Sequence, residues 1–476
     1  MTNAKKTKQI IVGKDVTLIL HISIFLLLCF FALVFAVDFS VYFVLLSFLF
    51  LSIFLEKAYR NHKWKMFVNV RVLFLVFLFL YTNFYPIFYV YFNLDLPIPV
   101  NVSLFAVRTA TILGNISICT AILLLHFIEK KDSQKRLIIN LEAKLKKIKP
   151  GPLFFIIEFI AAVYIIYYIF QIISSNAIGI MLSGVDRVQF DQTFQIWTHF
   201  LFDYIVVAYA CFIILMCSKR FFLRQKISRM MYLRLALCAL YYGFSTFLGH
   251  RRLLMYVLIF TLICVLIFSK RIQKRYVIGS VAGLALFVSV GYLRNVGFSF
   301  SNIFSPIAFF SALGEFMIPI NTLYYFIDNP PDVMFGASYL MTPLVLIPSG
   351  IWNNKPDLLA VRFADLMGGT MGYGYSPLTE AFINFSYLGF FLFPIILFII
   401  IIAVEKSVSV HPMFYLMFLI QCMNFNRGEF SAVFIEAAIM CGALCLMCAG
   451  GLKKKRSKIF SSKGGKNAVF NCYDSR

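Results

Sequence analysis

The sequence predicts an all-α membrane protein with about twelve transmembrane helices and one long outer loop that carries short helices. Three observations support this fold class. Hydrophobic residues make up 61% of the chain and charged residues only 14%, against roughly 45–50% and about 25% in soluble domains. Apolar runs of about twenty residues, the length that spans a bilayer, recur along the chain. The basic residues fall mainly in alternate loops, as expected for cytoplasmic loops.

The apolar runs fix the predicted spans in order along the chain. The first run begins near Val16 and lacks a small-residue cleavage site, so we expect a retained helix rather than a signal peptide. The spans are predicted at 16–37, 40–55, 66–92, 104–128, 152–174, 196–217, 231–247, 253–269, 276–293, 379–404, 412–426 and 430–450.

The loops between these spans fall into a basic class and a class with few basic residues. The basic loops hold 34 of the 44 Lys and Arg residues. Because they alternate with the other class, both termini are predicted to be cytoplasmic. The net charge of +23 is thus explained by basic cytoplasmic loops and does not indicate that the protein binds nucleic acid. The basic loops are 1–15, 56–65, 129–150, 218–230, 270–275, 405–411 and 451–476.

One basic loop, 129–150, has its own pattern. Leucines 137, 141 and 145 and Ile148 repeat at helical spacing, and lysines fill the gaps. This pattern predicts a basic amphipathic helix that lies on the inner leaflet and orients the protein.

The longest predicted outer segment, 294–378, divides the chain. Pro, Gly and Asn interrupt its apolar runs, while its aromatic residues and scarcity of Lys argue against disorder. We expect a folded periplasmic loop domain whose apolar pieces near 303–327 and 337–352 form interfacial or re-entrant helices, with two further crossings as the alternative. The predicted organisation is a nine-span bundle (1–293), this loop domain (294–378), three C-terminal spans (379–450) and a basic cytoplasmic tail (451–476).

Several kinds of chemistry have no motif in the sequence. It contains no P-loop, no Asp-x-Asp pair that would hold a metal with a nucleotide sugar, and no nucleophile elbow. The six histidines are scattered. Cys445 and Cys448 have C-x-x-C spacing but lie in an apolar run without further ligands, which favours core packing over a metal site. We expect no cofactor and no metal.

The ten basic residues outside the basic loops are the most informative feature, because nine of them are arginine. A guanidinium binds phosphate or carboxylate through two hydrogen bonds, whereas lysine is a hydrated point charge. Arg71 and Arg108 lie within helices and are expected to pair with Glu or backbone carbonyls. Arg234 is expected to snorkel from a cytoplasmic helix end. The outer turns and helix ends carry Arg251, Arg252, Arg294, Arg362 and Arg427.

This outer arginine set suits an anionic lipid headgroup, above all a pyrophosphate. Outside the cytoplasm the substrate must already be activated, as a sugar on a lipid pyrophosphate is, and arginines would stabilise the charge of the leaving group. Glu315, Glu380 or His250 is predicted to take the proton from the attacking hydroxyl, and Glu429 is a further acid nearby. For any single arginine the alternative is an interfacial anchor or a salt-bridge partner.

The order of several motifs carries a resemblance. They are "GHRR", the arginine of "GYLRNVG", the outer stretches "GEFMIP", "FGASYL" and "IPSGIWNNKP", then "SPLTEAFINFSYLGF" and "NRGEF". In this order, over most of the chain, they resemble the O-antigen polymerase (Wzy-type) family of oligosaccharide repeat-unit polymerases. By matching position, Arg251, Arg294 and Arg427 would hold the pyrophosphate or the growing saccharide, and Glu315 and Glu380 fall where relatives carry acidic or polar residues.

The resemblance also implies an architecture, a reaction and partners. It implies a GT-C-like glycosyltransferase in the bacterial inner membrane. This enzyme would join undecaprenyl-pyrophosphate-linked repeat units on the periplasmic face, without metal or nucleotide. A chain-length regulator (Wzz-type) and a flippase (Wzx-type) would act with it.

Two other functions remain open at this point. An O-antigen ligase would use the same donor on the same side of the membrane. A lipid-linked oligosaccharide flippase or transporter would place polar residues near the midplane and show internal repeats. We see no internal repeat, and the charges gather at one face, which favours the polymerase over the transporter.

Overall fold

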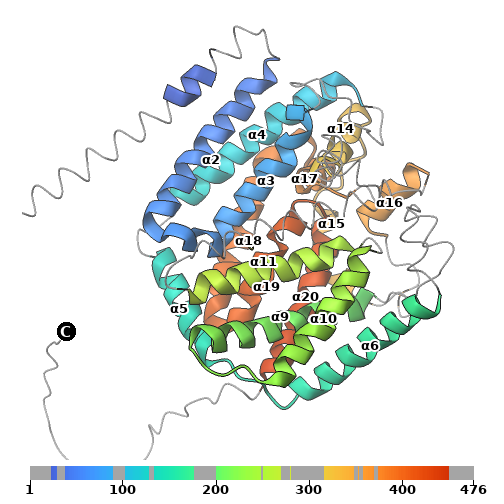
Figure 1. Ribbon diagram of the computed structural model, residues 1–476. Coiled ribbons are helices and arrows are strands. Elements are labelled where there is room, and N and C mark those ends of the chain that lie inside the picture. The colour runs from blue at the N-terminus through green and yellow to red at the C-terminus, as the bar shows by residue number, and fades with distance from the viewer. Residues whose placement is uncertain are drawn as a thin grey trace, which may run out of the picture.

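The computed structural model describes residues 23–28, 30, 38–88, 102–127, 133–175, 200–247, 250–269, 279, 316–347, 352, 357–368 and 374–449. All regular structure in these residues is helical, as predicted (Figure 1). Six of the described helices are long and apolar enough to cross a membrane, and three shorter ones are also apolar. The chain is therefore a multi-pass membrane protein.

Each predicted span that falls within the described residues coincides with one helix, except 379–404, which is divided between two. Span 16–37 is described only at 23–28 and 30, span 276–293 only at 279, and the tail 451–476 lies outside the described residues entirely. The long helices are α2 (Ser40–His62), α3 (Val70–Pro86), α4 (Leu104–Phe127), α6 (Phe154–Ser174), α9 (Phe200–Phe222), α10 (Arg229–Phe247), α11 (Arg251–Phe268), α18 (Gly389–Val410), α19 (Pro412–Phe425) and α20 (Phe430–Cys448). The shorter elements are η1 (Lys63–Val68), α5 (Ser133–Lys147), α14 (Asn321–Asp328), α15 (Ala337–Met341), η4 (Thr342–Leu346), α16 (Leu359–Leu366), α17 (Pro377–Phe385) and η5 (Ser386–Leu388).

Helix α19 is the centre of the bundle. It packs against α3, α5, α11, α18 and α20. Nearly all of its side chains are buried, because its sequence contains no charged residue and is apolar around its whole circumference. A helix of this composition is stable only when protein or lipid surrounds it, and here the surrounding helices do so.

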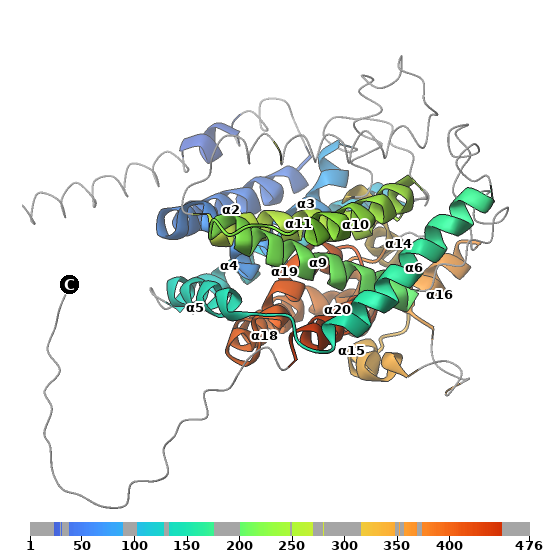
Figure 2. The ribbon, with the colours of Figure 1, turned by 60° about the horizontal axis from the view of Figure 1, so that its bottom comes forward.

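The two ends of the bundle differ in what covers them. Helices α14, α15, α16 and α17 gather at one end, and α5 lies at the other (Figures 1 and 2). We call these the outer and the inner end, after the predicted topology. Within the predicted outer segment, α14 and α15 with η4 confirm short helices for the described parts of 303–327 and 337–352.

Helix α5 forms where the amphipathic pattern predicts it, but its apolar face does not lie on a membrane surface. Leu141, Leu145 and Ile148 are fully buried, and the helix packs on α11, α18 and α19. Lys144 Nζ donates hydrogen bonds to the carbonyls of Val408 and Ser409, at 2.8 and 2.7 Å. A lysine at these carbonyls also favourably meets the negative end of α18. The leucine stripe therefore attaches α5 to the protein.

The span predicted at 379–404 is two helices rather than one. Helix α17 starts at Pro377, where Ser376 Oγ accepts a hydrogen bond from the Leu378 amide at 3.2 Å. The chain then breaks at Ser386, whose φ of 51° is left-handed, and resumes as α18. At Gly389 a Cβ would lie only 2.2 Å from the Ala381 carbonyl oxygen, so α18 can fold back against α17 only with glycine there. The break places α17 among α14, α15 and α18.

Candidate functional site

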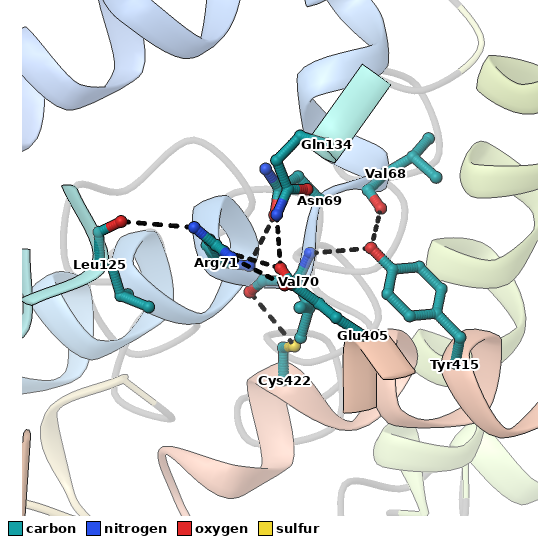
Figure 3. Close-up of polar contacts among 9 residues, drawn as sticks. All are labelled: Val68, Asn69, Val70, Arg71, Leu125, Gln134, Glu405, Tyr415 and Cys422. Atoms are coloured by element: carbon teal, nitrogen blue, oxygen red, sulfur yellow. Dashed lines mark hydrogen bonds and ion pairs between the residues drawn. The ribbon is translucent and has the colours of Figure 1, made fainter. Parts of the chain in front are cut away.

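The arginines expected to pair within the protein do so. Arg71 is buried and donates from Nε and Nη2 to the two oxygens of Glu405, both at 2.7 Å. Its Nη1 donates to the Leu125 carbonyl at 3.3 Å, and Gln134 Nε2 donates to Glu405 at 2.6 Å (Figure 3). This inner-end cluster ties α3, α4, α5 and α18 together.

The two other interior arginines are also paired. Arg108 forms an ion pair as expected, but its partner is Asp38 rather than a Glu or a backbone carbonyl. Arg234 differs from the expectation of snorkelling, because it forms two hydrogen bonds with the carboxylate of Glu158, one of them 2.9 Å long. A half-buried carboxylate within reach offers a stronger partner than the headgroup region does.

At the outer end, Arg252 lies in the first turn of α11 and reaches across to α20. Its Nη1 is 3.0 Å from Glu436 Oε1, and its Nη2 donates to the Tyr204 hydroxyl at 2.6 Å. The guanidinium also lies over the Tyr204 ring, 5.9 Å from its centroid. The Glu436 side chain is 2% exposed, whereas 35% of the Arg252 side chain is exposed. The arginine is thus anchored in the core and opens toward the outside.

Glu436 is held in turn by neighbouring helices. Its Oε2 accepts hydrogen bonds from Tyr256 Oη at 2.8 Å, Asn424 Nδ2 at 2.7 Å and Gln421 Nε2 at 3.4 Å. We call Arg252, Glu436, Tyr204, Tyr256 and Asn424 the outer arginine cluster. Glu436 was not among the residues predicted from the sequence. Its signal was present, since it is an ionisable residue inside an apolar span, which is a functional candidate by default.

Glu380 lies in a second polar group, where α15, α17 and α20 meet. It is buried, its Oε1 accepts from the Ser338 hydroxyl at 2.6 Å, and its Oε2 accepts from the Phe430 amide at 2.7 Å. Asn384 Nδ2 donates to Ser338 Oγ at 2.7 Å. The carboxylate thus caps the N-terminus of α20, where its negative charge is favourable.

Glu429 lies beside this group, at the N-cap position of α20. Its Oε2 accepts hydrogen bonds from the amides of Leu359 and Ala360, at the N-terminus of α16. Burial, then the charge of Glu380, raises the pKa of Glu429 to about 8, although the α16 amides and the charge of Arg362 act in the opposite direction. This carboxyl therefore loses its proton only as the pH approaches 8, and in its deprotonated form it can accept a proton.

Of the remaining predicted site residues, three have described side chains and three do not. Arg362 is exposed on α16 and lines the same cleft as Glu429. Arg427 lies in the turn between α19 and α20, and its carbonyl accepts a 2.7 Å hydrogen bond from the Tyr375 amide. His250 is half-buried at the N-cap position of α11. Arg251 is helical, but its side chain lies outside the described part of the structure, as do Arg294 and Glu315.

Helix α20 links the two polar groups. Glu429 and Glu436 are seven residues apart, which is about two turns or ~10 Å on the same face of a helix. Asp357, Glu429 and Arg362 line a cleft at the start of this helix. Glu436, further along it, anchors the Arg252 guanidinium. In the described residues, no three His, Cys, Asp or Glu side chains come together as metal ligands. This arrangement can bind anionic and hydroxyl-rich groups and move a proton between them.

Comparison with known proteins gives one match. A protein-family model described as O-antigen polysaccharide polymerase Wzy matches residues 18–456, nearly the whole chain. No curated protein and no solved structure matches the chain. The matched region contains both polar groups and every predicted site residue. The chain therefore belongs to the Wzy family of O-antigen polysaccharide polymerases, glycosyltransferase-type membrane enzymes that act on lipid-linked repeat units and polymerise them into O-antigen.

Proposed function

We propose that the enzyme joins repeat units carried on undecaprenyl pyrophosphate, and that it does so at the outer end of the bundle, on the periplasmic face of the bacterial inner membrane. The distribution of Lys and Arg supports this orientation, with both termini in the cytoplasm. The inner end is covered by the basic helix α5, whereas the outer end carries Arg252, Arg362 and Arg427, which lie outside the basic loops.

The observation that carries the proposal is the geometry of Arg252. Its guanidinium is fixed by Glu436 and Tyr204 inside the protein, yet a third of the side chain is exposed at the outer end. A charge held in place before the substrate arrives stabilises a developing negative charge without reorganising during the reaction. We assign to it the leaving pyrophosphate. Further ligands for the pyrophosphate or the saccharide are proposed to be Arg251, Arg294, Arg362 and Arg427.

The proposed reaction needs no nucleotide and no metal. A hydroxyl of one repeat unit attacks the anomeric carbon of another, the bond from that carbon to the pyrophosphate oxygen breaks, and undecaprenyl pyrophosphate leaves with the electron pair. The energy comes from the activated sugar, and arginines supply the positive charge that metal ions supply elsewhere. The proton acceptor was predicted among Glu315, Glu380 and His250. Both oxygens of Glu380 already accept hydrogen bonds, so we assign proton transfer to the carboxyl groups around Glu380 rather than to Glu380 alone.

The pathway partners follow from the same reaction. A flippase of the Wzx type would deliver the lipid-linked repeat unit to the outer face, and a regulator of the Wzz type would set the length of the product. Both partners are proposed from the family resemblance.

Deletion of the gene tests the proposal. The deletion strain should carry surface glycolipid capped with a single repeat unit, and the wild-type gene should restore the ladder of longer chains. A full ladder in the deletion strain would contradict the proposal. Long polymer that accumulates on the carrier lipid would instead indicate the ligase. The orientation is tested with green fluorescent protein fused after Arg476, which should fluoresce because it folds in the cytoplasm.

Polymer formation by purified enzyme tests the chemistry. Lipid-linked repeat units extracted from the deletion strain should be polymerised in nanodiscs with no added nucleotide and with a metal chelator present. A requirement for added nucleotide or divalent metal would overturn the proposed mechanism while leaving the polymerase family unchanged.

A further inference from the structure

A cleft lies at the outer end, between α15 with η4, the start of α16 and the start of α20. Its lining combines two kinds of surface. Ser338, Ser431, Asp357, Arg362 and Glu429 supply polar groups, and methionine, alanine, valine and leucine side chains supply an apolar wall. A sugar ring offers the matching surfaces, with hydroxyls around its edge and C–H groups on its faces.

One atom in this cleft lacks a partner. Glu429 is 1% exposed, and its Oε2 is occupied by two amides of α16. No hydrogen-bond donor among the described residues reaches its Oε1. A buried carboxyl oxygen without a donor is costly, and such groups in native proteins point to a missing ligand or a catalytic role. A hydroxyl in the cleft would supply the missing donor.

We propose that this cleft binds the terminal sugar of the acceptor repeat unit, and that Glu429 Oε1 accepts the proton of the hydroxyl that attacks the donor. The inference rests on the proposed polymerase reaction and adds to it the place of the acceptor and the identity of the base. The hydroxyl oxygen forms the new bond to the anomeric carbon, its proton passes to Glu429, and the electron pair of the broken bond leaves with the pyrophosphate.

The neighbours of Glu429 suit this role. The α16 amides hold Oε2, which fixes the direction of Oε1. Glu380 on α17 is close enough for its charge to raise the pKa of Glu429, and Arg362 on α16 lowers that pKa. Asp357 in the cleft and Tyr375 before α17 are the other titratable groups that face it. Glu380 thus acts through Glu429 as a positioning residue, which explains why its own oxygens are fully occupied.

The positions of donor and acceptor also follow. Helix α20 carries Glu429 at its start and Glu436, the anchor of Arg252, about two turns further on. With the pyrophosphate assigned to Arg252 and the acceptor hydroxyl to Glu429, the proposal places the anomeric carbon of the donor between them. This is the order of groups that an attack opposite to the leaving pyrophosphate requires.

The first test replaces Glu429 by Gln, whose amide oxygen can still accept the α16 amides. With extracted lipid-linked repeat units and wild-type enzyme as reference, polymerisation by Glu429→Gln should fall about 10²–10⁴-fold, the usual contribution of general-base catalysis. Glu429→Asp keeps a carboxyl group and should retain part of the activity. The matched control is Asp365→Asn, which removes an exposed carboxylate from α16 away from the cleft and should behave as wild type.

The pH profile gives a readout that loss of structure does not imitate. The base must be deprotonated, so wild-type activity should rise with pH around 8, the value to which burial raises the pKa of Glu429. The residual activity of Glu429→Gln should lack this rise. An unchanged pH profile in this variant would overturn the assignment of the base.

The acceptor site is tested separately with Ala337→Trp, because Ala337 lines the cleft and is partly exposed. The added ring should fill the cleft and raise the KM for the repeat unit with a smaller change in kcat. Wild-type kinetics in this variant would overturn the acceptor site. If wild-type enzyme forms no polymer at all, the proposed function fails. If it forms polymer and Glu429→Gln does so equally fast, only the further inference fails.

Discussion

The inner and outer ends of the bundle each hold an arginine–glutamate pair, and the two pairs are built in opposite senses. At the inner end the arginine is the more buried partner, with side-chain exposures of 5% for Arg71 and 13% for Glu405. At the outer end the acid is buried, with 35% for Arg252 and 2% for Glu436. The inner pair closes on itself and joins helices, whereas the outer pair fixes an acid in the core and directs a guanidinium outward.

This difference separates an arginine that is enclosed by its partners from one that is partly exposed at the outer end. Arg71 donates hydrogen bonds to both Glu405 oxygens and to the Leu125 carbonyl, so the inner pair holds helices together. Glu436 would be a buried charge without Arg252, and removing one partner of such a pair is strongly destabilising. The burial of Glu436 therefore determines where the outer guanidinium lies before any substrate binds.

The largest effect is expected at Arg252. Arg252→Ala should abolish polymer, because about 10²–10³-fold in rate is the usual cost of one preorganised donor and the charge of Glu436 is left unpaired as well. Arg252→Lys should be nearly as damaging, since a lysine cannot reach Glu436 and Tyr204 with a planar fork. The measurement is O-antigen ladder length at matched protein level. Wild-type length in Arg252→Lys would remove the argument from the guanidinium geometry.

Apolar replacement of each whole pair tests the comparison directly. Arg71→Ala should cost about 3–5 kcal/mol of folding free energy, and Arg71→Met combined with Glu405→Leu should recover most of it, because apolar pairs of similar volume often replace buried ion pairs. Arg252→Met with Glu436→Leu should likewise restore protein abundance, measured by size-exclusion chromatography, but not polymer. Polymer in the outer double variant would show that both pairs are structural.

The break between α17 and α18 is expected to be the next most sensitive feature. Gly389→Ala would bring a Cβ to 2.2 Å from the Ala381 carbonyl oxygen, so α17 and Glu380 must shift and both polymer and abundance should fall. Gly442→Ala in α20 is the matched control, because no atom lies within 4 Å of its added Cβ. The control should match wild type. Equal behaviour of the two variants would mean that the break does not position the outer site.

The smallest effect is expected at Arg108. It pairs with Asp38 near the predicted outer end, but half of its side chain is exposed, and such exposed pairs contribute about 0–1 kcal/mol. Arg108→Ala should leave ladder length unchanged and thermal stability nearly unchanged. This result would show that an arginine near the outer end is not essential unless it belongs to the outer arginine cluster. A loss of polymer as large as that of Arg252→Ala would show that location at the outer end is sufficient for function and that anchoring by a buried acid is not required.

The sequence by itself determined the class of the protein and the positions of its helices. Apolar length and the alternation of basic loops are local properties, and the helices of the described residues follow them. The contrast of arginine and lysine also singled out Arg252, Arg362 and Arg427 as candidate ligands. Two expectations were wrong because they depend on which groups meet in the fold and not on local helix propensity. Arg234 forms a hydrogen bond with Glu158, and the leucine stripe of α5 packs against other helices instead of lipid.

The tertiary structure alone decided how these residues meet. Glu436 and Tyr256 are 180 positions apart in the chain, and nothing in the spacing of either shows that they share a hydrogen bond. The left-handed Ser386 and the close approach at Gly389 turn one apolar run into two helices, which a hydropathy pattern cannot distinguish from a single span. This turn places Glu380 on α17, and the packing of α16 against the start of α20 leaves Glu429 Oε1 without a donor among the described residues. Hydrogen-bond partners of this kind are set by long-range packing and not by local sequence.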